Sequence, residues 1–283
     1  MSAPKVSFEF FPPKTEAAEA ALWKTVERLA PLNPEFVSVT YGADGSTRER
    51  THQVIARLLQ DTSMSPVPHL TCVGAPRAEI DAIADNYWQL GVRSLVALRG
   101  DPEGGAEADY QPHPDGYAYA SDLVAGLLAR HPFELFVAAY PETHPQALSP
   151  DADLENLRRK VDAGGHRAIT QFFFDNESYL RFRDRVAAAG ITVELIPGIL
   201  PVTNYNTLVR FAGACGAIIP SSLAQLFEGL DEDPTTRQLI AAHVAVNQAE
   251  ALRREGVDDF HFYTLNRADL SFAVCHALGV HAQ

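Results

Sequence analysis

The segment VSFEFFPP, residues 6–13, contains the first strand-like stretch of the chain and decides which α/β fold follows. Apolar and polar residues alternate over Val6–Phe10, as in a strand whose two faces meet different surroundings. The segment then enters Pro12-Pro13, whereas a doubly wound sheet that binds a dinucleotide usually has a glycine-rich turn at this point. The segment therefore favours a barrel, with an open doubly wound sheet as the alternative.

Strand-like and helical patterns alternate along the rest of the chain. The predicted strands are Val6–Phe10, Phe36–Thr40, Val67–Leu70, Leu95–Leu98, Leu135–Ala139, Ala168–Gln171, Thr192–Ile196 and Phe260–Tyr263. The predicted helices between and after them are Glu16–Leu29, Arg48–Leu59, Glu79–Leu90, Ser121–Ala129, Leu154–Asp162, Ser178–Ala189, Asn206–Ala214 and Ala268–Leu278. Eight such units with no linker predict an α/β fold, the (β/α)8 or TIM barrel. Pro220–Glu228 and Thr236–Glu255 are predicted as extra helices before the last strand, so residues 1–283 are expected to form a single domain.

Composition narrows the possible partners. The 283 residues contain 36 acidic and 23 basic side chains, and a net charge of −13 would repel nucleic acid. The three cysteines, Cys72, Cys215 and Cys275, form no CxxC pair, which favours a reduced, cytoplasmic compartment. No apolar run approaches the roughly 20 residues of a membrane span, and no HExxH or similar cluster indicates a metal. We therefore expect no nucleic-acid, membrane or metal partner.

Polar side chains collect at the carboxyl ends of several predicted strands. Because side chains alternate across a strand, the apolar residues Val6, Phe8 and Phe10 should face the helices while the polar ones face the barrel interior. The inward residues are then Ser7 and Glu9, Ser38 and Thr40, His69 with Thr71, and Ile169 with Gln171. Barrel enzymes place their chemistry at this end of the strands, so the pattern predicts a site there.

Glu9 and Asp101 each have a structural and a functional interpretation. A lone glutamate at a strand end is more often a surface or capping group, but phenylalanines flank Glu9, and an apolar pocket lets a carboxyl keep its proton near neutral pH. Asp101 precedes Pro102, so a turn role and a functional role are about equally supported. It opens the long loop Asp101–Gly116 at the predicted site. His69 alone is more often a satisfied barrel histidine than a metal ligand.

Eight segments of this chain resemble, in order and at similar spacing, the bacterial methylenetetrahydrofolate reductases. They are FEFFPPK (8–14), VTYGA (39–43), PHLTC (68–72), ALRGD (97–101), AAYPE (138–142), ITQFFFD (169–175), IPGILP (196–201) and FHFYTLNR (260–267). The resemblance implies a flavin-containing barrel that reduces 5,10-methylenetetrahydrofolate to 5-methyltetrahydrofolate for methionine synthesis. It implies FAD as cofactor, NADH or NADPH as co-substrate, and a homo-oligomer without a regulatory domain.

The resemblance also assigns roles to individual residues. The catalytic acid falls on Glu9, and the aspartate near the flavin and folate falls on Asp101. Folate contacts fall on Gln171, on the stacking residue Phe211, and on Leu265 and Arg267. FAD contacts fall on Thr40, His69, Arg99, Gly100, Asp101, Tyr119, Ala120, Ala138, Tyr140, His144, Asp153, Asn156 and Lys160. This chain departs from the family in having Thr207 where a glutamine is common, and in the long loop Asp101–Tyr119, with residues 112–115 inserted.

The chemistry requires an acid and a stabilising charge. The folate methylene bridge accepts hydride only after its ring opens to a 5-iminium cation, which requires a proton on N10, and Glu9 is predicted to supply it. Asp101 is predicted to stabilise the cation, and the two substrates are expected to take turns at one flavin face. The alternatives are a pterin-dependent methyltransferase barrel without flavin, and a barrel that only senses FAD or folate.

Overall fold

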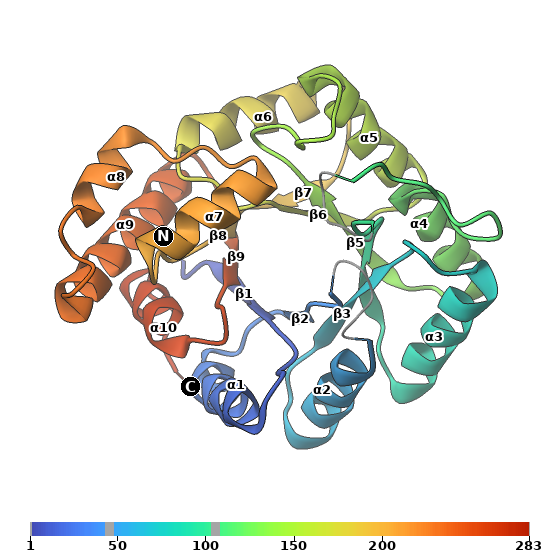
Figure 1. Cartoon of the computed structure of the whole chain (residues 1–283), viewed down its shortest axis with the longest axis horizontal. Coiled ribbons are helices and arrows are strands. Elements are labelled where there is room, and N and C mark those ends of the chain that lie inside the picture. The colour runs from blue at the N-terminus through green and yellow to red at the C-terminus, as the bar shows by residue number, and fades with distance from the viewer. Residues whose placement is uncertain (1, 43–47, 103–107, 283) are drawn as a thin grey trace.

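The computed structural model describes residues 2–42, 48–102 and 108–282. Parallel strands form a nearly closed barrel, with helices around its outside (Figure 1). The strands are β1 (Lys5–Phe10), β2 (Val37–Val39), β3 (Pro66–Thr71), β4 (Ser94–Leu98), β5 (Glu134–Ala139), β6 (Arg167–Thr170), β7 (Glu194–Ile196), β8 (Gly198–Ile199) and β9 (Asp259–Tyr263). All eight predicted strands are present, and the (β/α)8-type barrel is confirmed over the open sheet.

The seventh barrel position holds two short strands instead of the single predicted one. Strand β7 pairs with β6, while β8 pairs with β9, and only Pro197 separates them. Proline has no N–H to donate to a ladder, so pairing is interrupted at this residue. Its carbonyl still accepts from His261 N at 3.0 Å, which links β9 to the break and closes the ring.

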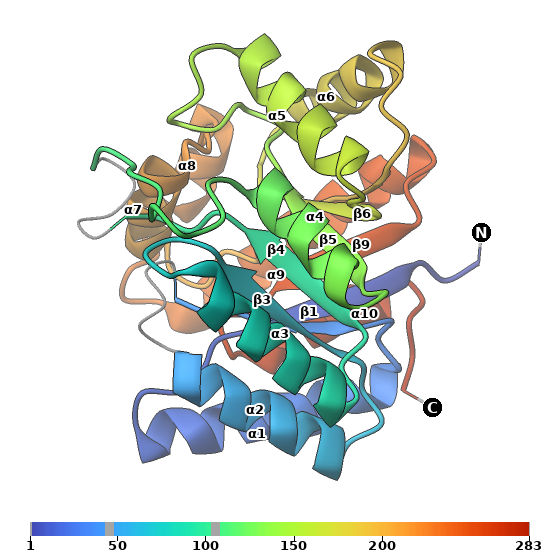
Figure 2. The same cartoon turned by 90° about the vertical axis from the view of Figure 1, so that its right-hand side faces the viewer.

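Helices cover the outer face of the barrel (Figure 2). They are α1 (Glu16–Leu29), α2 (Arg48–Asp61), α3 (Arg77–Leu90), α4 (Ala120–Arg130), α5 (Pro150–Asp162), α6 (Asn176–Ala188), α7 (Tyr205–Cys215), α8 (Ser221–Phe227), α9 (Pro234–Arg254) and α10 (Ala268–Ala277), with a 3-10 turn at Ala30–Leu32. The extra helices before the last strand are confirmed as α8 and α9. Helix α5 begins earlier than predicted because Ser149 caps it and Pro150 fills its first turn. No helix of the described residues is long and apolar enough to cross a membrane.

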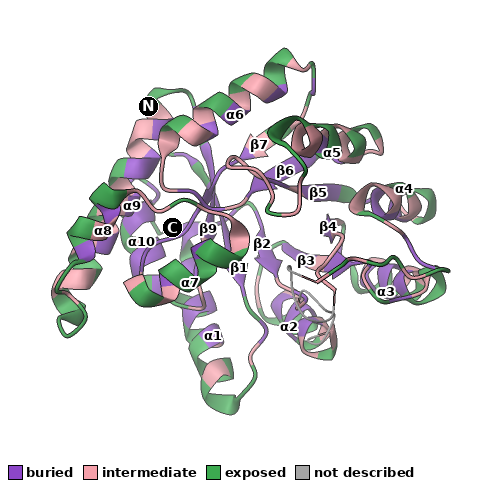
Figure 3. Ribbon diagram, turned by 45° about the horizontal axis from the view of Figure 1, so that its top comes forward, coloured by how far each residue is buried: buried purple, intermediate pink, exposed green. Residues whose placement is uncertain are grey.

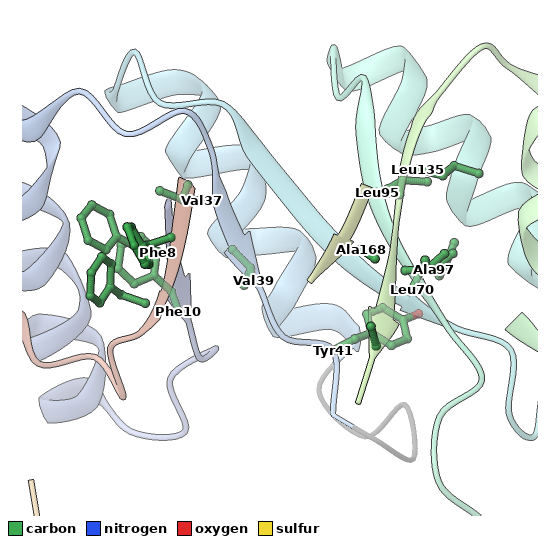
Figure 4. Close-up of a cluster of buried hydrophobic side chains, with 14 of the residues drawn as sticks. Phe8, Phe10, Val37, Val39, Tyr41, Leu70, Leu95, Ala97, Leu135 and Ala168 are labelled. Atoms are coloured by element: carbon green, nitrogen blue, oxygen red, sulfur yellow. The ribbon is translucent and has the colours of Figure 1, made fainter. Parts of the chain in front are cut away.

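Figure 3 shows the buried residues concentrated in the strands, with buried and exposed residues alternating along the helices. Hydrophobic clusters lie on both sides of the strands. Between strands and helices, Phe8, Phe10, Val37 and Val39 pack in one large cluster (Figure 4). Inside the barrel lies a smaller cluster of Phe36, Val67, Val96, Phe136, Ile169 and Ile196. The predicted alternation of faces is confirmed: apolar residues of β1 and β2 face the helices, and the polar residues between them face the barrel interior.

Candidate active site

Glu9 lies in the barrel interior near the carboxyl end of β1, and two histidines approach it. His69 Nε2, from β3, is 3.4 Å from Glu9 Oε2, and His261 Nε2, from β9, is 4.0 Å from the same oxygen. Glu9 is 6% exposed. Burial lowers the pKa of His69, so this ring is neutral at pH 7 although Glu9 opposes the shift. The inward direction predicted for Glu9 and His69 is confirmed.

The predicted phenylalanine pocket around Glu9 is wrong. Phe8 and Phe10 lie on the opposite face of β1 against the helices, and Phe11 is 37% exposed. Side chains alternate along a strand, so sequence neighbours of an inward residue point away from it. Imidazole rings therefore form the immediate surroundings of Glu9.

The loop between β9 and α10 holds the end of β1 in place. Thr264 Oγ1 donates to the backbone oxygen of Glu9 at 2.6 Å. The Asn266 side chain accepts from Phe11 N at 2.9 Å and donates to Phe11 O at 2.8 Å. Asn266 has a φ of 55°, in the left-handed region that asparagine tolerates better than most residues. These bonds fix the backbone that directly follows the Glu9 side chain.

A cavity of about 1000 Å³ opens at the carboxyl ends of β3, β4 and β5. All residues predicted to contact FAD line it, except Thr40 and His69. The predicted members are Arg99, Gly100, Asp101, Tyr119, Ala120, Ala138, Tyr140, His144, Asp153, Asn156 and Lys160. Its volume is at the upper end of the range for small-molecule sites, which leaves room for a dinucleotide.

The cavity wall fits an anionic group. Lys160 donates to Ala138 O at 2.5 Å, and burial lowers its pKa to about 8, against the opposing effect of Asp153. Among the described residues no carboxylate lies within ion-pair distance of this ammonium. Tyr119 and Ala120 bring the N-terminus of α4 to the same cavity, and helix N-termini attract phosphate groups. The residues present therefore fit the diphosphate of a dinucleotide cofactor.

Asp101 stands at the edge of the cavity beside Arg99. Arg99 Nη2 is 3.6 Å from Asp101 Oδ1 and donates to Gln146 Oε1 at 2.6 Å. Burial raises the pKa of Cys215, and the carboxylates of Asp101 and Glu9 raise it further. This thiol at the end of α7 therefore lies within electrostatic reach of both predicted catalytic groups. Residues 103–107 of the following loop, and Ala43, lie outside the described residues.

The remaining predicted folate residues lie on other elements around the mouth. Gln171 follows β6 and lines a small crevice with Tyr140 and Cys215. Phe211 is 42% exposed on α7, and Thr207 is on the same helix. Leu265, with a φ of 51°, packs against the cluster under α7 and α9, and exposed Arg267 is the N-cap residue of α10. Within the described part of the chain, no hydrogen bond or ion pair joins Phe211 or Arg267 to Glu9.

Sequence reasoning missed several residues that shape the site. Gln146 orients Arg99, and Tyr110, Ser121 and Arg159 also line the cavity, together with Thr71, which was predicted only to face inward. Gln146 carried no signal, because nothing in a loop sequence shows which side chain it will meet. His261 and Tyr263 lie in the predicted strand Phe260–Tyr263, but no role was predicted for either side chain. The alternation within β9 would have placed both rings inward beside Glu9.

The fold and site define a (β/α)8-type barrel protein with a buried carboxyl and a large cavity at the carboxyl ends of its strands. A family model described as methylenetetrahydrofolate reductase matches residues 2–279. The 5,10-methylenetetrahydrofolate reductase of Escherichia coli (strain K12) is 54% identical over 276 residues, covering 97% of this chain and 90% of that protein. That of Pectobacterium carotovorum subsp. carotovorum is 52% identical over the same shares. The chain therefore belongs to the methylenetetrahydrofolate reductase family.

A more distant relative has the same family name, and a solved structure has a similar fold. Methylenetetrahydrofolate reductase (NADH) 1 of Arabidopsis thaliana is 33% identical over 285 residues, covering 97% of this chain and 48% of the plant protein. Among solved structures, an uncharacterized protein from Clostridium thermocellum that binds two copies of 5-methyl-5,6,7,8-tetrahydrofolic acid has a TM-score of 0.63. It is 16% identical, and the match covers 98% of this chain and 94% of that one. At this identity, the likeness supports the barrel fold alone.

Proposed function

We propose that this barrel reduces 5,10-methylenetetrahydrofolate to 5-methyltetrahydrofolate with electrons from NADH, which pass through FAD held in the large cavity. The reductase activity follows from family membership. The observation that carries the detailed mechanism is the buried Glu9 carboxyl in the barrel interior, at the same ends of the strands as the cavity that Asp101 lines. The name of the plant relative, which specifies NADH, supports NADH over NADPH.

FAD would be held by the residues that line the cavity. Lys160 and Arg99 would oppose its diphosphate charge, with the N-terminus of α4 beside them. Gly100 has a φ of 84°, a conformation that glycine adopts without strain. When bound, the flavin supplies the hydride chemistry, and the barrel supplies orientation and charge.

Glu9 would act as the general acid. Its proton goes to N10 of the folate, the bond between N10 and the methylene carbon breaks, and the 5-iminium cation forms. Such proton transfer typically accelerates a reaction by roughly 10²–10⁴-fold. The carboxylate of Asp101 then stabilises the cation, which becomes 5-methyltetrahydrofolate on hydride transfer. Gln171 would hold the pterin, and Phe211 would stack against each substrate in turn.

Glu9→Gln tests this mechanism because the amide keeps the size of the side chain but cannot transfer a proton. Purified protein should be yellow, and NADH should reduce its flavin at a near-normal rate in stopped-flow measurements. Reduction of methylenetetrahydrofolate should fall by roughly 10²-fold or more. A variant that reduced the folate within about tenfold of wild type would exclude Glu9 as the donor. A colourless protein that cannot be reconstituted with FAD would instead favour the methyltransferase alternative.

A further inference from the structure

Tyr110 lies in the long loop Asp101–Tyr119, in which this chain departs from the family, and it lines the large cavity. No role has so far been given to this side chain, which is partly buried. Burial raises the pKa of its phenol to about 12, so the ring is uncharged at pH 7. A neutral aromatic ring therefore lies in a cavity wall that also contains the charged side chains of Arg99 and Lys160.

Helix α3 and its start hold the second half of this loop in place. Arg77 N donates to Asp115 O at 2.9 Å, and Arg77 Nε donates to Gly116 O at 3.0 Å. The hydroxyl of Tyr117 donates to Asp81 Oδ1 at 2.7 Å. Both backbone and side chains therefore bind the end of the loop to the barrel.

Tyr110 is itself held at both of its faces toward the loop. Its hydroxyl donates to Ala118 O at 2.5 Å, which ties it to the residues just before α4. Its ring centroid lies 5.8 Å from that of Tyr119, with the two planes tilted by 49°. Tyr119 is the N-cap residue of α4 and lines the same cavity. The position of the Tyr110 ring is therefore set by a hydrogen bond and an aromatic neighbour.

The ring of Tyr110 covers the guanidinium of Arg99. Arg99 Cζ lies 4.6 Å from the ring centroid, which is within the limit of about 6 Å for a cation–π contact. Arg99 Nε donates to Gly100 O at 2.9 Å, and its Nη2 donates to Gln146 Oε1 at 2.6 Å. Within the described part of the chain, the hydrogen bonds of Arg99 use these two nitrogens, which leaves Nη1 to donate to a ligand.

A guanidinium held in this way is prepared for an anion. A side chain that is already ordered loses little conformational freedom when a ligand binds, so less of the binding free energy is spent on ordering it. The ring also keeps water from one face of the guanidinium, and attraction between opposite charges is stronger where water is excluded. Both effects favour an anionic group beside Arg99.

We infer that Tyr110 is a positioning residue whose ring holds the Arg99 guanidinium ready for the diphosphate of FAD. The competing partner of this guanidinium is Asp101, whose Oδ1 is 3.6 Å from Arg99 Nη2. Without the ring, the guanidinium is free to turn to this carboxylate or to solvent, and the diphosphate loses a donor. This inference rests on the proposed function, in which FAD occupies the cavity.

The test measures the dissociation constant of FAD, with free flavin separated from the diluted holoenzyme by ultrafiltration over a range of FAD concentrations. Tyr110→Leu keeps apolar bulk but has no π face, so it should weaken FAD binding by roughly 3–30-fold, the range of a cation–π contact. Tyr110→Phe keeps the ring over Arg99 and should stay within about threefold of wild type. Gln111→Ala, at an exposed position of the same loop, is the control and should leave the constant unchanged.

A double-mutant cycle shows whether Tyr110 acts through Arg99. Tyr110→Leu should change the dissociation constant by less than about twofold in an Arg99→Met background, because the group that the ring positions is absent. An equal loss in both backgrounds would overturn the inference, and so would a Tyr110→Phe variant that binds FAD as weakly as Tyr110→Leu.

The same measurements separate this inference from the proposed function. If wild type bound FAD and Tyr110→Leu bound it equally tightly, the role of Tyr110 would be refuted and the proposed function would stand. A wild-type protein that bound no FAD at any concentration would refute both.

Discussion

Glu9 receives its chemical surroundings from strands that are distant in sequence. Two imidazoles reach its Oε2 from β3 and β9, and Thr264 fixes its backbone oxygen. The side chains next to it in sequence, Phe8 and Phe10, contribute to the packing of the helices instead. The site is therefore built from side chains at the alternate strand positions that face the barrel interior, and these side chains come from different strands.

Asp101→Asn should retain FAD and slow folate reduction much more than flavin reduction by NADH. The amide keeps the shape of the carboxylate but removes the charge that stabilises the iminium cation, so we expect a loss of about 10²-fold in that half-reaction alone. Asp109→Asn is the matched control, because this carboxylate lines the same cavity. Stopped-flow traces that showed equal slowing of both half-reactions would argue against a role specific to the cation.

Lys160 should make FAD affinity depend on pH. Burial lowers its pKa to about 8, and a bound diphosphate would raise it again, so binding takes up a proton. Affinity should therefore be constant below pH 8 and fall by up to about tenfold per pH unit above it. Fluorescence titration of the apoprotein measures this. Lys160→Met should bind FAD more weakly than wild type, with an affinity that does not change with pH. Arg159→Met keeps the lysine, so it should also bind FAD more weakly than wild type, but its affinity should still fall above pH 8.

At the scale of elements, the barrel closes between β6 and β9, where the two short strands β7 and β8 make the least regular pairing. Strands β7 and β8 together contain few residues, and Pro197 interrupts them. Closure relies on side chains and tight packing: Gly198 N donates to Thr170 Oγ1 at 3.0 Å, and the ring of Tyr263 lies directly over Gly198. The same Tyr263 ring packs against His261, so closure and the site share a residue.

Gly198→Ala should destabilise the fold. An added Cβ would lie 2.5 Å from Tyr263 Cε2 and still closer to Thr170 O, and this backbone oxygen cannot move away cheaply. We expect a loss of about 1–3 kcal/mol in the free energy of unfolding, measured by urea denaturation. Gly213→Ala provides the contrast: this glycine sits in α7 with open space around it, so alanine should stabilise by up to about 1 kcal/mol. Equal effects at both positions would contradict the packing argument.

In the whole molecule, the candidate active site and a cluster of ion pairs around Arg167 lie at opposite ends of the barrel. The cavity and Glu9 lie at the carboxyl ends of the strands, and at the amino ends Arg167 joins β6 to three carboxylates. Its Nη2 is 2.5 Å from Asp259 and 3.2 Å from Glu35, and its Nε is 2.8 Å from Glu194. Burial raises the pKa of Asp259 to about 6 despite the arginine. This cluster ties β6, β7, β9 and the start of β2 together below the site.

Arg167→Met should destabilise the barrel at pH 7 and do so less in acid. Without the guanidinium, the buried Asp259 carboxylate would lose its partner and be repelled by the more exposed Glu35 and Glu194, at a cost of roughly 3–5 kcal/mol. The native pKa of Asp259 is raised above its unfolded value, so its burial cost is present above pH 6 and is relieved as pH falls toward 4. Urea denaturation at pH 7 and pH 5 should show a smaller loss at pH 5.

Arg181→Met is the control for this cluster, because its arginine is 64% exposed and pairs with Asp175 at the surface. It should change stability by less than about 0.5 kcal/mol at either pH. If Arg167→Met lost the same free energy of unfolding at pH 7 and at pH 5, protonation of Asp259 would not relieve its burial cost as described.

The sequence alone determined the order of strands and helices, the inward parity of Glu9 and His69, and the family, because these depend on local periodicity and motif. It also located half of the cavity lining, through the family resemblance. It did not determine the break at Pro197, the histidine surroundings of Glu9, or the partners of Arg99 and Arg167. These depend on contacts between residues far apart in the chain, such as Ser7 with His261, whose meeting is decided only when the barrel closes.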